Sequence, residues 1–244
     1  MTAKIQIGTS GWHYNHWRGP FYPEDLPAKK MLEFYIQYFG TVELNNSFYR
    51  LPKPSALKNW RDSVPKDFLF AAKASRFITH MKKLKDPKKP LRNVIPRLEY
   101  LKEKLGPILF QLPGGWNCNP ERLEEFLKAL PTKHRYAFEF RNHTWHNDAV
   151  YELLHEHNSA FVIYEFDHFI SPAEVTADFT YFRLHGPEGK YEGDYTIKQL
   201  TTWANLIKKL RRKTKQVYVY FDNDQAGYAV KNALKLKELL RVKR

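Results

Sequence analysis

The sequence predicts an α/β fold, a single (β/α)8 barrel of the TIM type with long βα loops over its carboxyl-end face. Eight short segments rich in Phe, Tyr, Val and Ile recur along the chain, and sequence with helical apolar spacing separates most of them. Strands that alternate with helices form parallel sheets with right-handed crossovers. A length of 244 residues is also usual for this barrel. We expect one domain over residues 1–244.

The predicted strands and helices follow one another along the whole chain. The strands cover residues 4–7, 41–45, 68–73, 108–112, 136–141, 160–164, 180–185 and 217–222. The helices cover residues 28–39, 55–62, 91–105, 120–130, 148–156, 196–212 and 226–240. Prolines precede or open several of these helices, and Asn119 supplies an N-cap before Pro120. Residues 167–178 show only a doubtful helix. GTSGW after the first strand does not match GxGxxG, so an open dinucleotide-binding sheet is the weaker alternative.

Composition limits where the protein works and what it binds. No run of 18 apolar residues occurs, so we expect no membrane contact. MTAKIQIGTSGW enters a strand without a signal region, which favours a cytoplasmic protein. Cys118 is the only cysteine and excludes an internal disulfide. A formal charge of +14 favours an anionic partner, although surface lysines can also serve solubility alone.

Alternation along the strands directs polar side chains into the barrel. In residues 136–141, Phe138 and Phe140 share one face, and Glu139 and Arg141 share the other. Apolar faces of barrel strands pack under the helices, so the polar faces point inward. By the same alternation, further side chains are expected to point into the barrel: Glu43, Asn45, Lys73, Gln111, Arg183, His185, Tyr220 and Asp222. Most of these residues come late in their strands, at the end where such barrels build active sites.

These inward residues suggest acid–base chemistry on an anionic small molecule. We expect the catalytic residues to be Glu43, Glu139, His185 and Lys73. Cations suited to binding the anion are Lys73, Arg141 and Arg183. Further substrate contacts are expected from Asn45, Gln111, Tyr220, Asp222, Trp12 and Tyr191. The alternative is a structural network of buried ion pairs. We expect no metal and no cofactor, because three cations would repel a divalent ion and His185 is the only well-placed histidine.

Three long loops are predicted at the same end of the barrel. The loop after the first strand holds Trp12, Tyr14, Trp17, Phe21 and Tyr22 and either packs as a lid or offers faces for stacking. Residues 75–90 carry six basic residues and one acid, which suits phosphate binding. GPEGKYEGDY after the seventh strand is glycine-rich, so Lys190 and Tyr191 could cover a ligand.

Several motifs in order resemble the YecE-like family, domain of unknown function 72 (DUF72). They are GTSGW, WRGPFYP, VELNNSFYR, FAAKASRFITH, FQLP, FEFRNHTW, RLHG and YVYFDND, and they cover essentially residues 5–230. The resemblance implies a TIM-type barrel and little about activity. The positions that match the family's motifs include Glu43, Asn45, Lys73, Gln111, Glu139, Arg141, Arg183 and His185. Asp222 departs from it, because the family is expected often to carry asparagine there.

Three functions remain open from the sequence. The first is an enzyme, such as a hydrolase, lyase or isomerase, that acts on a phosphate- or carboxylate-bearing small molecule. The second is a nucleic-acid-binding protein or nuclease that uses the basic loop 75–90 and the aromatic loop. The third is a non-catalytic barrel with a structural polar interior. The oligomeric state does not follow from the sequence.

Overall fold

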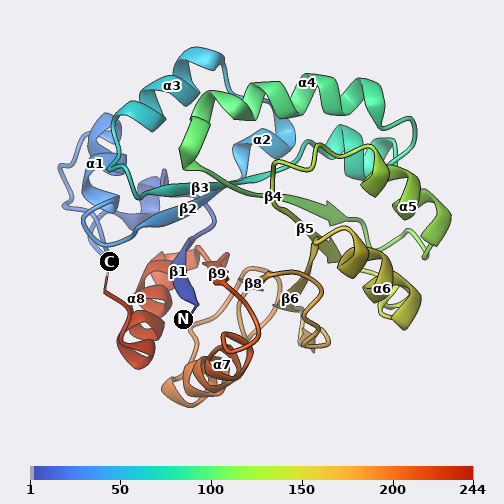
Figure 1. Ribbon diagram of the computed structural model, residues 1–244. Helices are drawn as coiled ribbons and strands as arrows, with labels where there is room; N and C mark the ends of the chain where they lie inside the picture. Colours follow the sequence, from blue (N-terminus) through green and yellow to red (C-terminus); the bar gives the residue numbers. More distant parts are fainter. Residues whose placement is uncertain (1–2, 244) are drawn as a thin grey trace. The chain divides into compact units, whose positions relative to one another are not determined.

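The computed structural model describes residues 3–243 and contains every strand that the sequence predicts (Figure 1). These strands are β1 (Lys4–Thr9), β2 (Thr41–Leu44), β3 (Leu69–Lys73), β4 (Leu105–Leu112), β5 (Tyr136–Phe140), β6 (Ala160–Phe166), β8 (Phe179–Leu184) and β9 (Gln216–Phe221). Their order in the sheet is β1-β9-β8-β6-β5-β4-β3-β2. A parallel bridge between Ser10 and Glu43 joins the two ends of that order. The fold is therefore a (β/α)8 barrel, as predicted.

The chain divides into two compact units. Unit 1 falls within Met1–Glu43, Ile163–Ala173 and Phe179–Arg244, and unit 2 within Leu44–Val162 and Glu174–Asp178. That the two units act together as one domain, as expected from the sequence, stays a prediction.

Unit 1 is built on parallel pairing of β1 with β9 and of β9 with β8. Helix α8 (Tyr228–Leu240) packs against β1, β9 and α7 (Ile197–Leu210). Thr196 and Gln199 form a capping box that begins α7. Residues 28–39 form a 3₁₀ turn, η2 (Ala28–Lys30), and a short helix, α1 (Met31–Tyr35), in place of the longer predicted helix.

Unit 2 is built on β3, β4, β5 and the start of β6, all parallel. Its helices are α2 (Asn46–Tyr49), α3 (Pro54–Asp62), α4 (Lys88–Leu98), α5 (Pro120–Lys128) and α6 (Asp148–Glu156). The predicted outward face of β5 is confirmed, because Phe138 lies edge-on to Phe126 of α5 and Phe140 stacks on Trp145. These rings form the apolar layer between the strands and the helices.

Several predicted boundaries are wrong. The helix expected over 91–105 begins earlier and ends in a 3₁₀ turn, η4 (Glu99–Lys104), so Leu105 and Gly106 belong to β4. Residues 167–178, where the sequence left a helix in doubt, contain no helix; β7 (Phe169–Ile170) folds back on β6 as an antiparallel hairpin. Its turn uses Asp167 and His168 with positive φ, a conformation that these two residue types adopt more readily than most. A π-helix, η3 (Phe77–Met81), occupies part of the loop 75–90. Among residues 3–243, no helix is long and apolar enough to cross a membrane.

Candidate functional site

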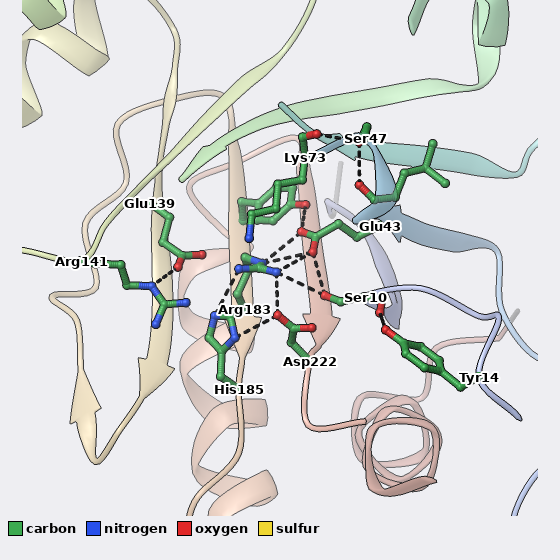
Figure 2. Close-up of polar contacts among 12 residues, drawn as sticks. Ser10, Tyr14, Glu43, Ser47, Lys73, Glu139, Arg141, Arg183, His185 and Asp222 are labelled. Carbon is green, nitrogen blue, oxygen red and sulfur yellow. Dashed lines mark hydrogen bonds and ion pairs between the residues drawn. The ribbon is translucent and has the colours of Figure 1, made fainter. Parts of the chain in front are cut away.

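A buried guanidinium organises the polar residues of unit 1. Arg183, near the carboxyl end of β8, is fully buried, and so is Glu43 of β2. Arg183 Nε donates to both carboxylate oxygens of Glu43, at 3.2 and 3.1 Å, and Nη2 donates to Oε1 at 2.7 Å. The same Nη2 donates to Asp222 Oδ2 at 2.8 Å (Figure 2). One arginine therefore pairs with two carboxylates.

Glu43 is also held by two neutral donors. Ser10 Oγ donates to Oε1 at 2.7 Å, and the Tyr181 hydroxyl donates to Oε2 at 2.5 Å. Burial, followed by the nearby charge of Glu43, raises the pKa of Tyr181 well above its ordinary value, so Tyr181 keeps its proton. Both oxygens of Glu43 are thus occupied by protein donors, and the carboxylate is a fixed counter-ion for Arg183.

His185 completes the cluster with a defined orientation. Its Nε2 lies 3.3 Å from Arg183 Nη1. A guanidinium can only donate, so Nε2 must accept, and Nδ1 carries the hydrogen. Nδ1 lies 3.1 Å from Asp222 Oδ2. Tyr191 and Phe166 pack edge-on against the imidazole, with ring centroids 5.4 Å away in each case. These contacts fix the tautomer and the plane of the ring.

Charge and exposure single out Asp222 within this group. Arg183, His185 and Glu43 expose none of their surface, whereas Asp222 keeps 7%. Two carboxylates face one guanidinium, and His185 lies against the less enclosed of them, Asp222. We call Ser10, Glu43, Tyr181, Arg183, His185 and Asp222 the Arg183 cluster.

Tyr14 lies beside the Arg183 cluster. Its hydroxyl donates to the Ser10 carbonyl at 2.6 Å. Burial, then the charges of Asp222 and Asp224, raise its pKa, so the hydroxyl remains a donor. Burial also raises the pKa of Asp224, with a further contribution from Asp222. The carboxyl end of β9 is therefore rich in acidic groups.

In unit 2 the predicted inward residues also form local contacts. Arg141 Nε donates to Glu139 Oε1, and Glu139 is fully buried (Figure 2). Gln111 is the register partner of Glu139, and its amide donates to the Leu112 carbonyl at 2.9 Å. Lys73 Nζ lies 4.5 Å from the centre of the Phe48 ring, a cation–π contact.

The remaining predicted site residues differ in how deeply they are buried. Tyr220 is fully buried, and its hydroxyl lies 2.7 Å from Thr41 Oγ1. Trp12 is 8% exposed, and its carbonyl accepts from the Tyr22 hydroxyl. Tyr191 is 39% exposed where it covers His185. Asn45 does not end a strand as predicted, since it is the N-cap residue of α2.

The aromatic loop packs on itself rather than offering stacking faces. Trp17 is fully buried, Tyr22 is 1% exposed, and Trp17 Nε1 donates to the Asp224 carbonyl at 2.9 Å. Of the two readings left open by the sequence, packing is the one that this part of unit 1 supports.

Sequence reasoning missed Ser10, Tyr181 and Glu165. Tyr181 shares the strand parity of Arg183 and His185, so the pattern contained its signal. Glu165 lies one residue beyond the predicted strand end, and β6 continues through it. Trp203 Nε1 donates to Glu165 Oε2 at 3.2 Å, and burial raises the pKa of this carboxyl. Across residues 3–243, no three His, Cys, Asp or Glu side chains form a group that could hold a metal ion.

Comparisons with known proteins agree with the fold. The family model described as "Protein of unknown function DUF72" matches residues 6–244. The chain is 26% identical to the UPF0759 protein YunF of Bacillus subtilis, over 98% of this chain and 95% of YunF. A DUF72 structure from Thermotoga maritima has 32% identity and a TM-score of 0.89, over 98% of this chain and 99% of that one. A DUF72 structure from Enterococcus faecalis has 20% identity and a TM-score of 0.80, over 99% of both chains, and shows the fold alone.

Proposed function

This chain belongs to the DUF72 family, and from that premise we propose that it is an enzyme that transfers a proton on a phosphate- or carboxylate-bearing small molecule. The observation that carries the proposal is the His185–Asp222 pair, with Nδ1 3.1 Å from Oδ2, at the carboxyl ends of β8 and β9. Active sites of (β/α)8 barrels are built at this end. A titratable pair in a buried charged cluster is a candidate acid–base group.

The contacts favour Asp222 over Glu43 as the group that exchanges the proton. Glu43 has no exposed surface and receives donors on both oxygens. Asp222 retains some exposure, while Arg183 donates to its Oδ2 and His185 Nδ1 lies 3.1 Å from the same oxygen. We assign Asp222 as the acid–base residue of this chain, and His185 and Arg183 as the residues that position it; because asparagine is expected at this position in many relatives, the assignment does not extend to the family. This changes the roles expected from the sequence, which gave proton transfer to Glu43, Glu139 or His185.

The substrate class rests on charge. The formal charge of +14 favours anionic ligands, and phosphate or carboxylate groups are the common anions of small metabolites. Arg183 is already paired with Glu43 and Asp222, so the cations that bind the anion would have to lie outside the Arg183 cluster. The anion-binding roles of Lys73 and Arg141, and the substrate contacts assigned to Asn45, Gln111 and Tyr191, stay predictions.

Conversion of a compound panel tests the proposal. Wild-type protein, Asp222→Asn and His185→Gln are incubated with phosphate- and carboxylate-bearing compounds, and turnover is followed by phosphorus and proton NMR. We expect wild type to convert at least one compound and Asp222→Asn to be slower by about 100-fold or more, the usual effect of losing an acid–base group.

Glu165→Gln is the matched control, because it removes another buried carboxylate of unit 1 outside the Arg183 cluster. It should turn over the same compound at close to the wild-type rate. The proposal fails if the wild type converts nothing in the panel, or if Asp222→Asn is as active as the wild type while folded.

A second candidate, nucleic-acid binding through loop 75–90, is favoured by exposed apolar groups beside its cations. Phe77 is 44% exposed and Met81 66% exposed on the π-helix, and Arg76 and Lys85 are exposed next to them. Cations beside an exposed aromatic ring together suit a single-stranded nucleic acid.

Arg76→Glu/Lys85→Glu should abolish salt-dependent binding of oligothymidylate. Lys208→Glu/Lys209→Glu, with the same charge change on exposed residues of α7, should leave it nearly intact. Equal losses in both would count against this candidate.

A further inference from the structure

A basic groove lies on the helical layer of unit 2 and shares no residue with the Arg183 cluster. It is formed where η4 packs against α3 and α4. Its volume is about 870 Å³, within the range of small-ligand sites. The residues that line it are Leu51, Lys58, Arg61, Arg92, Asn93, Pro96, Arg97, Glu99, Tyr100 and Lys102. None of them was predicted as a site residue from the sequence.

The groove has a large excess of positive charge. Five of its lining residues are cations, and Glu99 is its only acid. Lys133 Nζ and His134 Nε2 lie 2.6 and 2.9 Å from Glu99 Oε1, and these bonds lower the pKa of Glu99. This carboxylate is therefore already neutralised by residues outside the groove.

Most of these cations have no carboxylate partner. Arg61 pairs with Asp62 at 2.7 Å. Within residues 3–243, the other four form no ion pair: Lys58, Arg92, Arg97 and Lys102. Four unpaired cations around one concavity repel each other unless an anion is bound.

Two guanidinium groups are fixed in place by backbone carbonyls. Arg97 Nη1 donates to the Pro52 carbonyl at 3.1 Å, and Arg61 Nη1 donates to the Tyr100 carbonyl at 3.2 Å. Each guanidinium keeps further N–H groups for a phosphate oxygen. Restrained donors lose less entropy when a ligand binds.

An aromatic ring and apolar side chains complete the lining. Tyr100 is 37% exposed, and Lys58 Nζ lies 5.2 Å from its ring centre. Leu51 and Pro96 add apolar surface. A ring beside cations suits a ligand with both a planar base and phosphates.

We propose that this groove binds a nucleoside polyphosphate. Its phosphates would contact Arg92, Arg97 and Lys102, and its base would lie on Tyr100. The ligand is either a free nucleotide or the terminus of a strand, since both offer the same chemistry. The groove includes no residue of the Arg183 cluster or of loop 75–90, so the inference stands independently of both functions proposed above.

Calorimetric titration of the full chain tests the groove with four probes: ATP, AMP, inorganic tripolyphosphate and a 5′-triphosphorylated dinucleotide. We expect ATP to bind more tightly than AMP, because the cations respond to phosphate charge, and more tightly than tripolyphosphate, because Tyr100 contacts the base. Arg92→Glu/Lys102→Glu should weaken ATP by about tenfold or more, as expected from reversing two direct charge contacts. Tyr100→Ala should remove the advantage of ATP over tripolyphosphate.

Lys208→Glu/Lys209→Glu is the control for net charge, and it should keep ATP affinity within about twofold of wild type, as expected for remote charges screened by salt. Tighter binding of the dinucleotide than of ATP identifies a strand end as the ligand, and the reverse order identifies a free nucleotide. The proposal is overturned if wild type binds neither ATP nor the dinucleotide, or if the control variant loses as much affinity as the groove variant.

Discussion

The guanidinium of Arg183 has no exposed surface and pairs with two carboxylates, those of Glu43 and Asp222. Taking such charges out of water costs several kcal/mol per ion, so the arrangement persists only because every partner is in place. Removing different members of the cluster should therefore have unequal effects. Loss of the cation leaves two carboxylates buried together, whereas loss of Glu43 leaves Arg183 paired with Asp222.

Substitution of Arg183 should destabilise the protein more than substitution of Glu43. We expect Arg183→Met to lower the free energy of unfolding by about 3–5 kcal/mol, the usual result of breaking a buried pair. Glu43→Gln keeps an acceptor for Ser10 and should cost less. Chemical denaturation measures both, and equal losses would show that Asp222 does not compensate the arginine.

Glu165 should make stability depend on pH. Its raised pKa means that the folded state binds this proton more tightly than the unfolded state. The stabilisation from that proton is fully present below the unfolded pKa and is lost as pH rises through the folded pKa. Glu165→Gln, which removes the charge, should therefore raise the melting temperature at pH 8 and change it little at pH 4. Melting curves across this range check the sign, and a stabilisation larger at pH 4 would contradict it.

The same carboxylate also satisfies buried donors. Trp203 Nε1 and the Tyr195 hydroxyl both bond to Glu165. Glu165→Leu would leave them without an acceptor, at a cost of about 1–3 kcal/mol per orphaned donor. Urea unfolding should thus rank Glu165→Leu below wild type and Glu165→Gln. A Leu variant as stable as the Gln variant would show that these bonds add nothing.

At the scale of elements, strand alternation predicted both β8 and its inward face. Arg183 and His185 share a parity in the sequence, and the structure joins them through Nη1 and Nε2. The partners of that pair were harder to predict. Ser10 follows β1 and Tyr181 lies two residues before Arg183, but only the register of neighbouring strands brings both to Glu43. Periodicity reports which face a residue occupies and not which residue lies opposite.

Short elements escaped prediction for a related reason. The four residues of α2 and the two of β7 are too few to show a period. The β6–β7 hairpin depends on two consecutive residues with positive φ, which apolar patterning does not reveal. The N-terminus of α7 is different, because a capping residue is a local signal in the sequence.

Thr196→Ala should test that signal. The Thr196 hydroxyl accepts from the Gln199 amide, and the Gln199 side chain bonds back to the Thr196 amide. Loss of such a cap costs about 0.5–2 kcal/mol. Thr201→Ala is the matched control, because Thr201 lies within α7 and is exposed. It should be neutral or slightly stabilising, since alanine favours helix interiors. Denaturant midpoints compare the two, and equal losses would show that the box contributes nothing beyond helix propensity.

At the scale of the whole molecule, alternation of strand and helix was sufficient to predict the barrel. The basic groove was not predictable in the same way, because its cations come from three elements and have no common period. Net charge was visible in the sequence, but only the structure shows that Arg183 is paired with carboxylates whereas most cations of the groove are not. The charge should nevertheless affect the stability of the entire chain.

With 40 basic and 26 acidic residues, the folded protein repels itself at low ionic strength. Added sodium chloride should therefore raise the melting temperature up to about 0.15 M, where the Debye length is about 8 Å. Tripolyphosphate at equal ionic strength should raise it further, because a ligand that binds only the folded state adds stabilisation by mass action. The Arg92→Glu/Lys102→Glu variant should keep the chloride response and lose the extra effect of tripolyphosphate. If chloride and tripolyphosphate act equally on the wild type, the excess charge is merely screened and no polyphosphate site contributes.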